Sequence, residues 1–347
     1  MSILFSSPNC CLIDHGDYSY RLYKDVEISQ FDTQNFILSQ KLFSIKYCAK
    51  DINRKRSHNA ADSEEEVTMV EGMFNNFNEE ISPELKKKIY DKYNVLDTAD
   101  VRHLAKQLFE STAFDHTGIS AGNNSEIPLK QDINNEEFLI PQNCKFHCGC
   151  VKAKCEKLNG SRYDIVISDP PWWNKYIRRL KNANEKLSYK MMYNEDIASI
   201  PVRNLFSNNC LVAMWCTNAR SNIAAVKELI FPKWGVEYLT TWYWLKVSIE
   251  LKPICPFGKG SQKQPYERII LGKVGAVGKV TDNLLIVSVP SALHSHKPPL
   301  LDLLRPYVEV ENPQILELFA RYLLPNTTSV GYEPLKWQHL SLYDNVT

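Results

Sequence analysis

Residues 163–172 read YDIVISDPPW, a nearly continuous apolar run that ends in an acid, two prolines and a tryptophan. Such runs are typical of strands that are buried on both faces of a sheet. The two prolines fix φ and remove two backbone donors, so the strand cannot continue beyond Asp169. The sequence therefore predicts a buried strand that carries an acidic side chain and a rigid turn at its carboxyl end.

Similar apolar runs recur along the chain after residue 138. They occupy residues 211–217, 238–247, 267–274, 284–289 and 315–320. Helical patterns lie between several of them, as in ASIPVRNLF, ARSNIAAVKELIF and PPLLDLLRPYV. This alternation predicts an α/β domain over residues 138–347, with a mostly parallel sheet covered by helices. Ligands bind such sheets beyond the carboxyl ends of the strands, where Asp169 lies.

The rest of the chain divides into two regions. Residues 1–50 have no clear period and stay unassigned, and residues 51–137 form a linker and helical region for which we expect substrate binding. Ser82-Pro83 predicts the start of a helix, and the spacing of apolar residues over 97–111 predicts an amphipathic helix. The polar stretch 115–137 predicts a loop.

Composition excludes several classes of protein. Of the 347 residues, 41 are Lys or Arg and 40 are Asp or Glu, so the net charge of +1 excludes a polybasic protein that coats a polyanion. A hydrophobic content of 44% excludes a disordered chain. No apolar run is long enough for a membrane span, and no secretory signal is recognisable at the first residues. We expect a soluble intracellular protein whose ten cysteines are reduced thiols.

The turn at the end of the first strand provides chemistry suited to a flat group that carries an amine. The Asp169 carboxylate and the Pro170 carbonyl are placed to accept the two amine hydrogens, while Trp172 stacks on the ring. The alternative is a strand that simply ends in a proline turn with Asp169 as a cap. We assign the catalytic role to four residues, Asp169, Pro170, Pro171 and Trp172.

DPPW after an apolar strand resembles the signature of the adenine-N6 methyltransferases, the family of the catalytic subunit of the mRNA N6-adenosine methyltransferase. The resemblance covers most of residues 138–347, and DPPWWNKYIRR, SALHSHKPPL and LELFARYL are most similar to one branch of this family. It implies a Rossmann-like, permuted methyltransferase sheet with a smaller, mostly helical N-terminal region. The permutation places the catalytic strand before the cofactor strand, which accounts for the missing GxGxxG motif.

The resemblance also implies the cofactor S-adenosyl-L-methionine and its binding residues. Lys297 meets the methionine carboxylate, helped by a helix that starts at Pro298-Pro299, and Glu317 accepts hydrogen bonds from the ribose. An ion pair between Glu317 and Arg321 at the strand end is the alternative. The cofactor-binding residues that we expect are Ser295, Lys297, Glu317, Leu318, Phe319, Arg321 and Glu333.

Three segments depart from the family pattern. Residues 146–150 read FHCGC where relatives carry an acidic residue, and Leu324 and Tyr332 replace polar residues of the cofactor site. The thiols and imidazole of Cys144, His147, Cys148, Cys150 and Cys155 have no spacing that fits a zinc site. We expect buried thiols there, and no metal there or at the HxH motif of residues 294–296.

Six basic residues against one acid in residues 175–190 form a local basic patch beside the DPPW turn. Basic and aromatic residues together suit a single nucleic-acid strand, and a solvated basic loop is the alternative. The end of the strand 211–217 faces the same site. The substrate-binding residues that we expect are Asn174, Lys175, Arg178, Arg179, Tyr189, Trp215 and Asn218.

The function that we expect is N6-methylation of adenine in nucleic acid, with RNA favoured and DNA as the alternative substrate. The branch resemblance implies the internal 2′-O-methyladenosine of U2 small nuclear RNA. An inactive nucleic-acid-binding pseudo-methyltransferase and a metal or redox protein are rival hypotheses. We expect an active monomer in the nucleus, with a cytosolic or mitochondrial pool as the alternative. Arg54-Lys55-Arg56 is either a nuclear-import signal or a solvated loop.

Overall fold

A computed structural model describes residues 2–29, 32–47, 61–173, 191–258 and 263–346, without the side chains of residues 61–63. Eleven described strands form one large sheet in the order β1-β2-β13-β11-β12-β10-β9-β14-β15-β8-β5. Its strands are β1 (Ile3–Ser7), β2 (Cys10–Ile13), β5 (Ser120–Asn123), β8 (Cys144–Cys148), β9 (Tyr163–Ser168), β10 (Phe206–Cys216), β11 (Glu237–Lys246), β12 (Tyr266–Val274), β13 (Leu285–Ser288), β14 (Ile315–Leu318) and β15 (Thr327–Gly331).

The strands of this sheet mostly run in one direction, as the apolar runs predicted. β9 pairs in parallel with both β10 and β14, and the parallel order continues through β15 to β8. β12 is antiparallel to both of its neighbours, β10 and β11. The carboxyl ends of β8, β15, β14, β9, β10 and β11 therefore meet at one edge, and β12 begins at that same edge.

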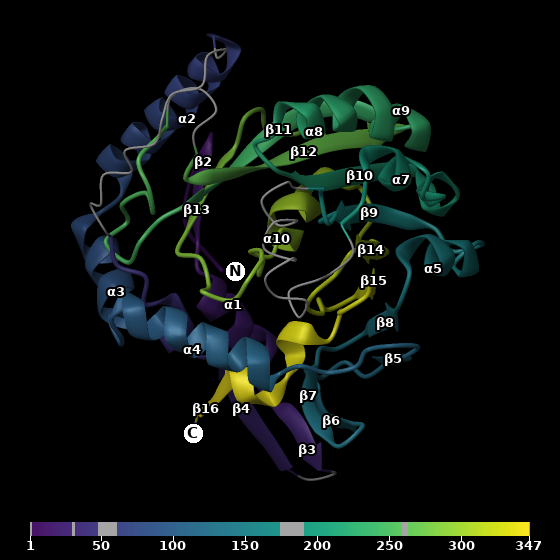
Figure 1. Ribbon diagram of the computed structural model, residues 1–347, viewed down its shortest axis with the longest axis horizontal. Coiled ribbons are helices and arrows are strands. Elements are labelled where there is room, and N and C mark those ends of the chain that lie inside the picture. The colour runs from purple at the N-terminus through teal and green to yellow at the C-terminus, as the bar shows by residue number, and fades with distance from the viewer. Residues whose placement is uncertain (1, 30–31, 48–60, 174–190, 259–262, 347) are drawn as a thin grey trace.

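Helices cover both faces of the large sheet (Figure 1). They are α1 (His15–Leu22), α2 (Ala61–Glu80), α3 (Pro83–Tyr93), α4 (Thr98–Ser111), α5 (Val151–Lys157), α7 (Asn194–Ala198), α8 (Arg220–Ala225), α9 (Phe231–Trp234) and α10 (Leu301–Leu304). The shorter turns are the 3-10 helices η1 (Gln40–Phe43), η3 (Val202–Leu205), η5 (Arg305–Tyr307), η6 (Lys336–Gln338) and η7 (Leu340–Leu342), and a π-helix, η4 (Val226–Ile230).

Two cores fill the space between the helices and the sheet. On one face, Ile165 and Ile167 of β9 pack in a cluster with residues of α2, α3 and α10. On the opposite face, Val166 packs with residues of α5, α7 and α9. This arrangement follows from the alternation of side chains along a strand, and it explains why β9 is apolar at successive positions.

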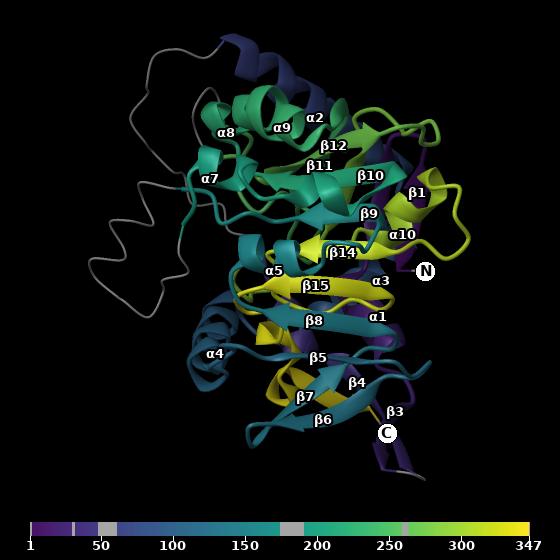
Figure 2. The same ribbon diagram turned by 90° about the vertical axis from the view of Figure 1, so that its right-hand side faces the viewer.

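A smaller sheet in the order β16-β4-β3-β6-β7 lies beyond the β5 end of the large sheet (Figure 2). Its strands are β3 (Val26–Ser29), β4 (Asp32–Leu38), β6 (Leu129–Ile133), β7 (Glu136–Ile140) and β16 (Tyr343–Val346). The prediction of a loop over residues 115–137 is wrong, because this segment contains β5 and β6. Asn134 and Asn135 have φ of 54° and 66° and close a two-residue hairpin, a turn that matches the twist of its strands.

The three regions expected from the sequence contribute jointly to the large sheet. β1 and β2 come from residues 1–50, and β2 pairs with β13. β5 comes from residues 51–137 and pairs with β8. The regions are thus ranges of sequence that share one sheet. The N-terminal region also contains strands β1 to β6 besides its helices.

Two helix predictions are confirmed and one is wrong. Ser82 Oγ accepts a hydrogen bond from the backbone N–H of Leu85 at the start of α3, and α4 occupies the predicted amphipathic segment. The helix expected to start at Pro298-Pro299 is only the four-residue α10, which begins at Leu301. Prolines lack the donors that a helix needs, and Pro306 interrupts the segment again. A helix N-terminus therefore contributes little field beside Lys297.

None of the helices in the described residues is long and apolar enough to span a membrane.

Candidate active site

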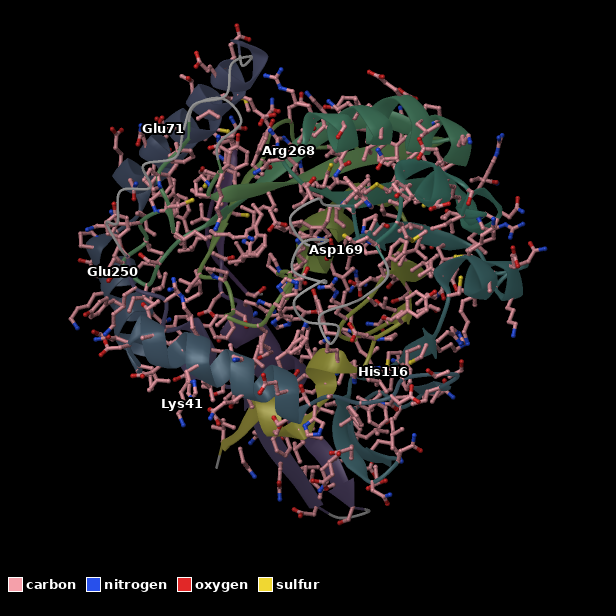
Figure 3. The ribbon with its side chains drawn as sticks, in the orientation of Figure 1. Lys41, Glu71, His116, Asp169, Glu250 and Arg268 are labelled. Carbon is pink, nitrogen blue, oxygen red and sulfur yellow. The ribbon has the colours of Figure 1, made fainter. Side chains whose placement is uncertain are left out.

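Asp169 lies at the carboxyl end of β9, near the centre of the molecule (Figure 3). Its backbone N–H donates to the carbonyl of Leu318 at the end of β14, at 3.2 Å, so the two strand ends are held together. The Asp169 side chain is 17% exposed. Burial raises its pKa above the ordinary value, and the positive charges of Lys297 and Arg321 offset only part of this rise. The carboxylate therefore takes a proton more readily than a surface aspartate.

Two lysines and a glutamate continue the charged network from Asp169. Lys297 Nζ lies 3.9 Å from Asp169 Oδ1 and forms an ion pair with Glu267, which also pairs with Lys246. Burial opposes the charge on the Glu267 carboxylate, but the ammonium groups of Lys297 and Lys246 hold the pKa of Glu267 below its ordinary value. Burial likewise opposes the charge on Lys297, whose pKa is nevertheless raised by Asp169 and Glu267.

A cavity of about 210 Å³ adjoins this network and is lined by Trp244, Lys246, Glu267, His294, Ser295 and Lys297 among others. Ser295 has a φ of 57°, which turns the chain sharply between the exposed His294 and the buried His296. Sequence reasoning missed Lys246 and Glu267. They end one apolar run and begin another, and the antiparallel direction of β12 brings them to the same edge.

Trp172 does not provide the stacking surface that the sequence predicted. Its side chain is only 6% exposed and belongs to the core on the α5 and α7 face. Its indole N–H donates to the carbonyl of Trp215 at 3.0 Å, which fixes the turn against β10. The ring packs into the neighbouring apolar core, so its face is not offered to a ligand. Trp215 is itself buried, with Lys297 Nζ 5.0 Å from its ring centroid.

Asn218 lies in a hydrogen-bonded network behind the strand ends. Its side-chain amide donates to the carbonyl of Tyr266 at 2.8 Å, and its oxygen accepts from Arg268. Arg268 in turn pairs with Glu66 of α2, which thereby reaches the large sheet. Both ends of the Asn218 amide are engaged within the protein. In this arrangement the residue anchors the start of β12 and does not offer its amide to a substrate.

The expected cofactor residues of β14 lie beside Asp169. Leu318 is fully buried, and Phe319 adopts a φ of 63° that ends the strand. A small hollow of about 30 Å³ is lined by Asp169, Pro171, Phe319, Ala320, Arg321, Tyr332 and Glu333. Glu333 is paired with Lys336 at 2.9 Å. Leu324 is 1% exposed and packs in the core, so it takes no part in this hollow.

Glu317 is the most unusual acid of the site. It is 7% exposed, and its Oε2 is buried without a hydrogen-bond partner among the residues that the structure describes. Burial, with a smaller contribution from the charge of Asp169, raises its pKa to about 8. A buried polar atom without a partner is costly and rare in proteins. It fits a ligand that brings hydroxyl donors, and the residues around it are therefore compatible with the nucleoside of S-adenosyl-L-methionine.

Several predicted residues cannot be placed in this site. Asn174, Lys175, Arg178, Arg179 and Tyr189 lie outside the described residues, as does the basic motif of residues 54–56. Of the expected cysteine cluster, Cys144, Cys148 and Cys155 are buried and Cys150 is exposed. Within the described ranges, no group of three or more His, Cys, Asp and Glu side chains comes together as metal ligands would.

An acidic proline turn at the carboxyl edge of a mostly parallel sheet, next to a strand with a buried acid, is consistent with a Rossmann-like methyltransferase fold. Residues 163–333 match the MT-A70 family, and this segment is an MT-A70 domain. The sequence resemblance to the DPPW-motif adenine-N6 methyltransferases is thereby confirmed.

Three relatives illustrate what this chain is similar to. The mouse protein named N(6)-adenine-specific methyltransferase METTL4 is 34% identical over 234 residues, which cover 64% of this chain and 48% of that protein. The DNA N6-methyl methyltransferase of Caenorhabditis elegans is 38% identical over 60% of this chain and 56% of its own length. The N6-methyladenosine RNA methyltransferase MTA1 of Cryphonectria parasitica is 31% identical over 57% of this chain and 60% of its own.

The chain spans about half the length of the METTL4 relatives that it matches. The first of these comparisons agrees with the branch singled out from DPPWWNKYIRR, SALHSHKPPL and LELFARYL, which is that of methyltransferase-like protein 4.

Proposed function

We propose that this protein transfers a methyl group from S-adenosyl-L-methionine to N6 of an adenine in nucleic acid. The observation that carries the proposal is the position of Asp169, partly buried at the end of β9 and hydrogen-bonded through its backbone to the end of β14. This places the expected amine acceptor beside the expected cofactor residues. A metal or redox function would leave this juxtaposition without a purpose.

The residues at the β9 edge perform the positioning that this reaction needs. The Pro170 carbonyl accepts a hydrogen bond from the backbone N–H of Trp172 at 2.8 Å, which fixes its direction and leaves its second lone pair for the substrate. With the Asp169 carboxylate it accepts the two N6 hydrogens. The adenine amine is a weak nucleophile, so orientation and fixed charges supply most of the catalysis.

When bound, S-adenosyl-L-methionine supplies the methyl group as an electrophile. Lys297 and Glu317 are the residues that would hold its methionine and ribose ends. The N6 nitrogen gains one carbon and must lose one proton. Asp169 is suited to accept this proton because burial raises its pKa. Lys297 lies close enough to stabilise the carboxylate before that transfer.

We further propose RNA as the preferred substrate, a nuclear location and action as a monomer. The relatives are named for both RNA and DNA, so the substrate class needs a direct comparison. The branch resemblance supports the 2′-O-methyladenosine of U2 small nuclear RNA as the target. The activity and the choice of polymer are tested by giving recombinant protein matched single-stranded RNA and DNA oligomers together with labelled cofactor. Cofactor and oligomer binding without turnover on either polymer would instead identify a pseudo-methyltransferase.

A further inference from the structure

Two aromatic side chains next to the DPPW turn form a stack that the predicted mechanism does not use. The rings of Trp173 and Tyr193 are 5.9 Å apart between centroids and inclined by only 19°. Trp173 is half-buried, whereas Tyr193 is 59% exposed and is the most exposed of the large hydrophobic side chains described. Because Tyr193 is largely exposed to solvent, a further flat ring can be added to this stack.

The backbone holds this pair rigidly beside the catalytic turn. Trp173 N–H donates to the carbonyl of Met192 at 3.1 Å, and Met192 N–H donates to the carbonyl of Pro171 at 2.9 Å. Trp173 follows Asp169 by four positions, so their Cα atoms are at most roughly 14 Å apart. A base stacked on this pair can therefore belong to the same nucleic-acid strand as a target adenine that is bound at Asp169.

The charges around the stack select the kind of ligand. Tyr193 is the N-cap of α7, whose first turn carries the carboxylates of Glu195 and Asp196. These acids are exposed and oppose a phosphate or another anion at this surface. An uncharged flat ring, in contrast, gains stacking area without a charge penalty.

We infer that Trp173 and Tyr193 form a stacking platform for an unpaired base that flanks the target adenine. The inference rests on the proposed function and adds a binding site to it. Stacking of this kind tolerates any base, because every base has a π face. The platform therefore fixes the position of the strand and does not read its sequence. It also takes over the aromatic role near the turn that Trp172, buried in the core, does not fill.

Binding of a labelled single-stranded RNA with one adenine, and of versions in which each flanking nucleotide is abasic, tests the inference. For the wild type we expect one flanking abasic position to weaken binding about 5- to 150-fold. For Tyr193→Ala we expect the intact RNA to bind as weakly as that abasic RNA does to the wild type, with no further loss from the abasic position. Tyr193→Phe should keep the wild-type pattern.

Tyr238→Ala is the matched control, because Tyr238 is 39% exposed at the opposite edge of the sheet. It should bind every RNA as the wild type does. A flat abasic scan in a wild type that methylates the intact RNA would overturn the platform alone. An equal loss for all RNAs in a folded Tyr193→Ala protein would also overturn it. A wild type that neither binds nor methylates any adenine oligomer would overturn the platform and the proposed function together.

Discussion

Lys297 Nζ lies 3.9 Å from Asp169 Oδ1, although the two residues come from motifs far apart in the sequence. Lys297 also pairs with Glu267, so one ammonium group connects the catalytic turn with the start of β12. Three unlike segments thus meet at the strand edge. The charge of Lys297 keeps two partly buried carboxylates, those of Asp169 and Glu267, compatible with each other, in addition to the role that we propose for it at the methionine end of the cofactor.

The first prediction concerns Lys297. Lys297→Met removes a charge partner for the cofactor carboxylate, and such charge-assisted bonds contribute about 1.5–3 kcal/mol. We expect the affinity for S-adenosyl-L-methionine, measured by calorimetry, to fall about 10- to 150-fold. Lys273→Met, at the far end of β12, is the control. Unchanged cofactor affinity together with a collapse of RNA binding would show that Lys297 serves the substrate.

The second prediction concerns the pH dependence of stability that Glu317 causes. An unfolded glutamate ionises near pH 4.5, but the pKa of folded Glu317 is about 8. Between these values the folded protein binds the extra proton, so the free energy of unfolding falls as pH rises, by about 1.4 kcal/mol per pH unit. Glu317→Gln abolishes this fall. We expect its gain over the wild type, from urea unfolding, to be about 2 kcal/mol larger at pH 8 than at pH 6. If the free energies of unfolding of Glu317→Gln and the wild type change in parallel between pH 6 and 8, the raised pKa of Glu317 is contradicted.

The third prediction concerns the contact between α2 and the large sheet. Arg268 has a side chain only 7% exposed, and Glu66 is its ion-pair partner. Removing one partner leaves a buried charge without compensation, which typically costs 3–5 kcal/mol. Because Glu66 is itself partly exposed, we expect Glu66→Ala to lower the free energy of unfolding by about 3 kcal/mol. Glu71→Ala, on the exposed side of the same helix (Figure 3), should change it by less than about 0.5 kcal/mol.

The fourth prediction concerns two buried histidines that join α1 to the segment before Lys297. The rings of His15 and His296 are 4.3 Å apart between centroids, and burial lowers the pKa of His15 to about 4. Below pH 6.5 His15 binds a proton in the unfolded chain but stays neutral in the folded protein. The free energy of unfolding therefore falls as the pH falls towards 4. We expect the free energy of unfolding of His15→Phe to fall by about 2 kcal/mol less than that of the wild type between pH 6.5 and 4.5.

His103→Phe is the control for this effect, because His103 is exposed on α4. Its acid profile should follow that of the wild type. If His15→Phe also follows the wild-type profile, the buried pair does not govern acid stability.

Sequence patterns predicted those features of the fold and site that depend on interactions between neighbouring residues in the chain. The apolar runs located β9 and β14, and the acids Asp169, directly after β9, and Glu317, within β14, were found because an acid beside or inside an apolar run is conspicuous. The partners Lys246 and Glu267 were missed because their proximity depends on the antiparallel direction of β12. The burial of Trp172 was missed for a similar reason, since tertiary packing decides which way a ring turns after a proline turn.

The strands of residues 115–137 were missed because β5 and β6 are short and mostly polar, and β5 lies at the edge of the large sheet. The pair Asn134-Asn135, a hairpin signal, was available in the sequence and was not used. The length of α10 was overestimated because the apolar period of residues 300–308 was weighed above Pro298 and Pro299 before it and Pro306 within it. In each case a neighbouring segment or a turn residue overrode the period of the apolar residues.

Methyl transfer from labelled S-adenosyl-L-methionine to an adenine-containing RNA, by the wild type and by Asp169→Asn, tests the central claim most directly. The substitution keeps the size of the side chain and removes its charge and its capacity to accept the proton. We predict N6-methyladenine from the wild type, and a rate at least about 100-fold lower from the folded variant. We also predict cofactor affinity within a few-fold of the wild type. A variant that methylates the RNA at the wild-type rate would contradict the assignment of Asp169 as the catalytic acceptor.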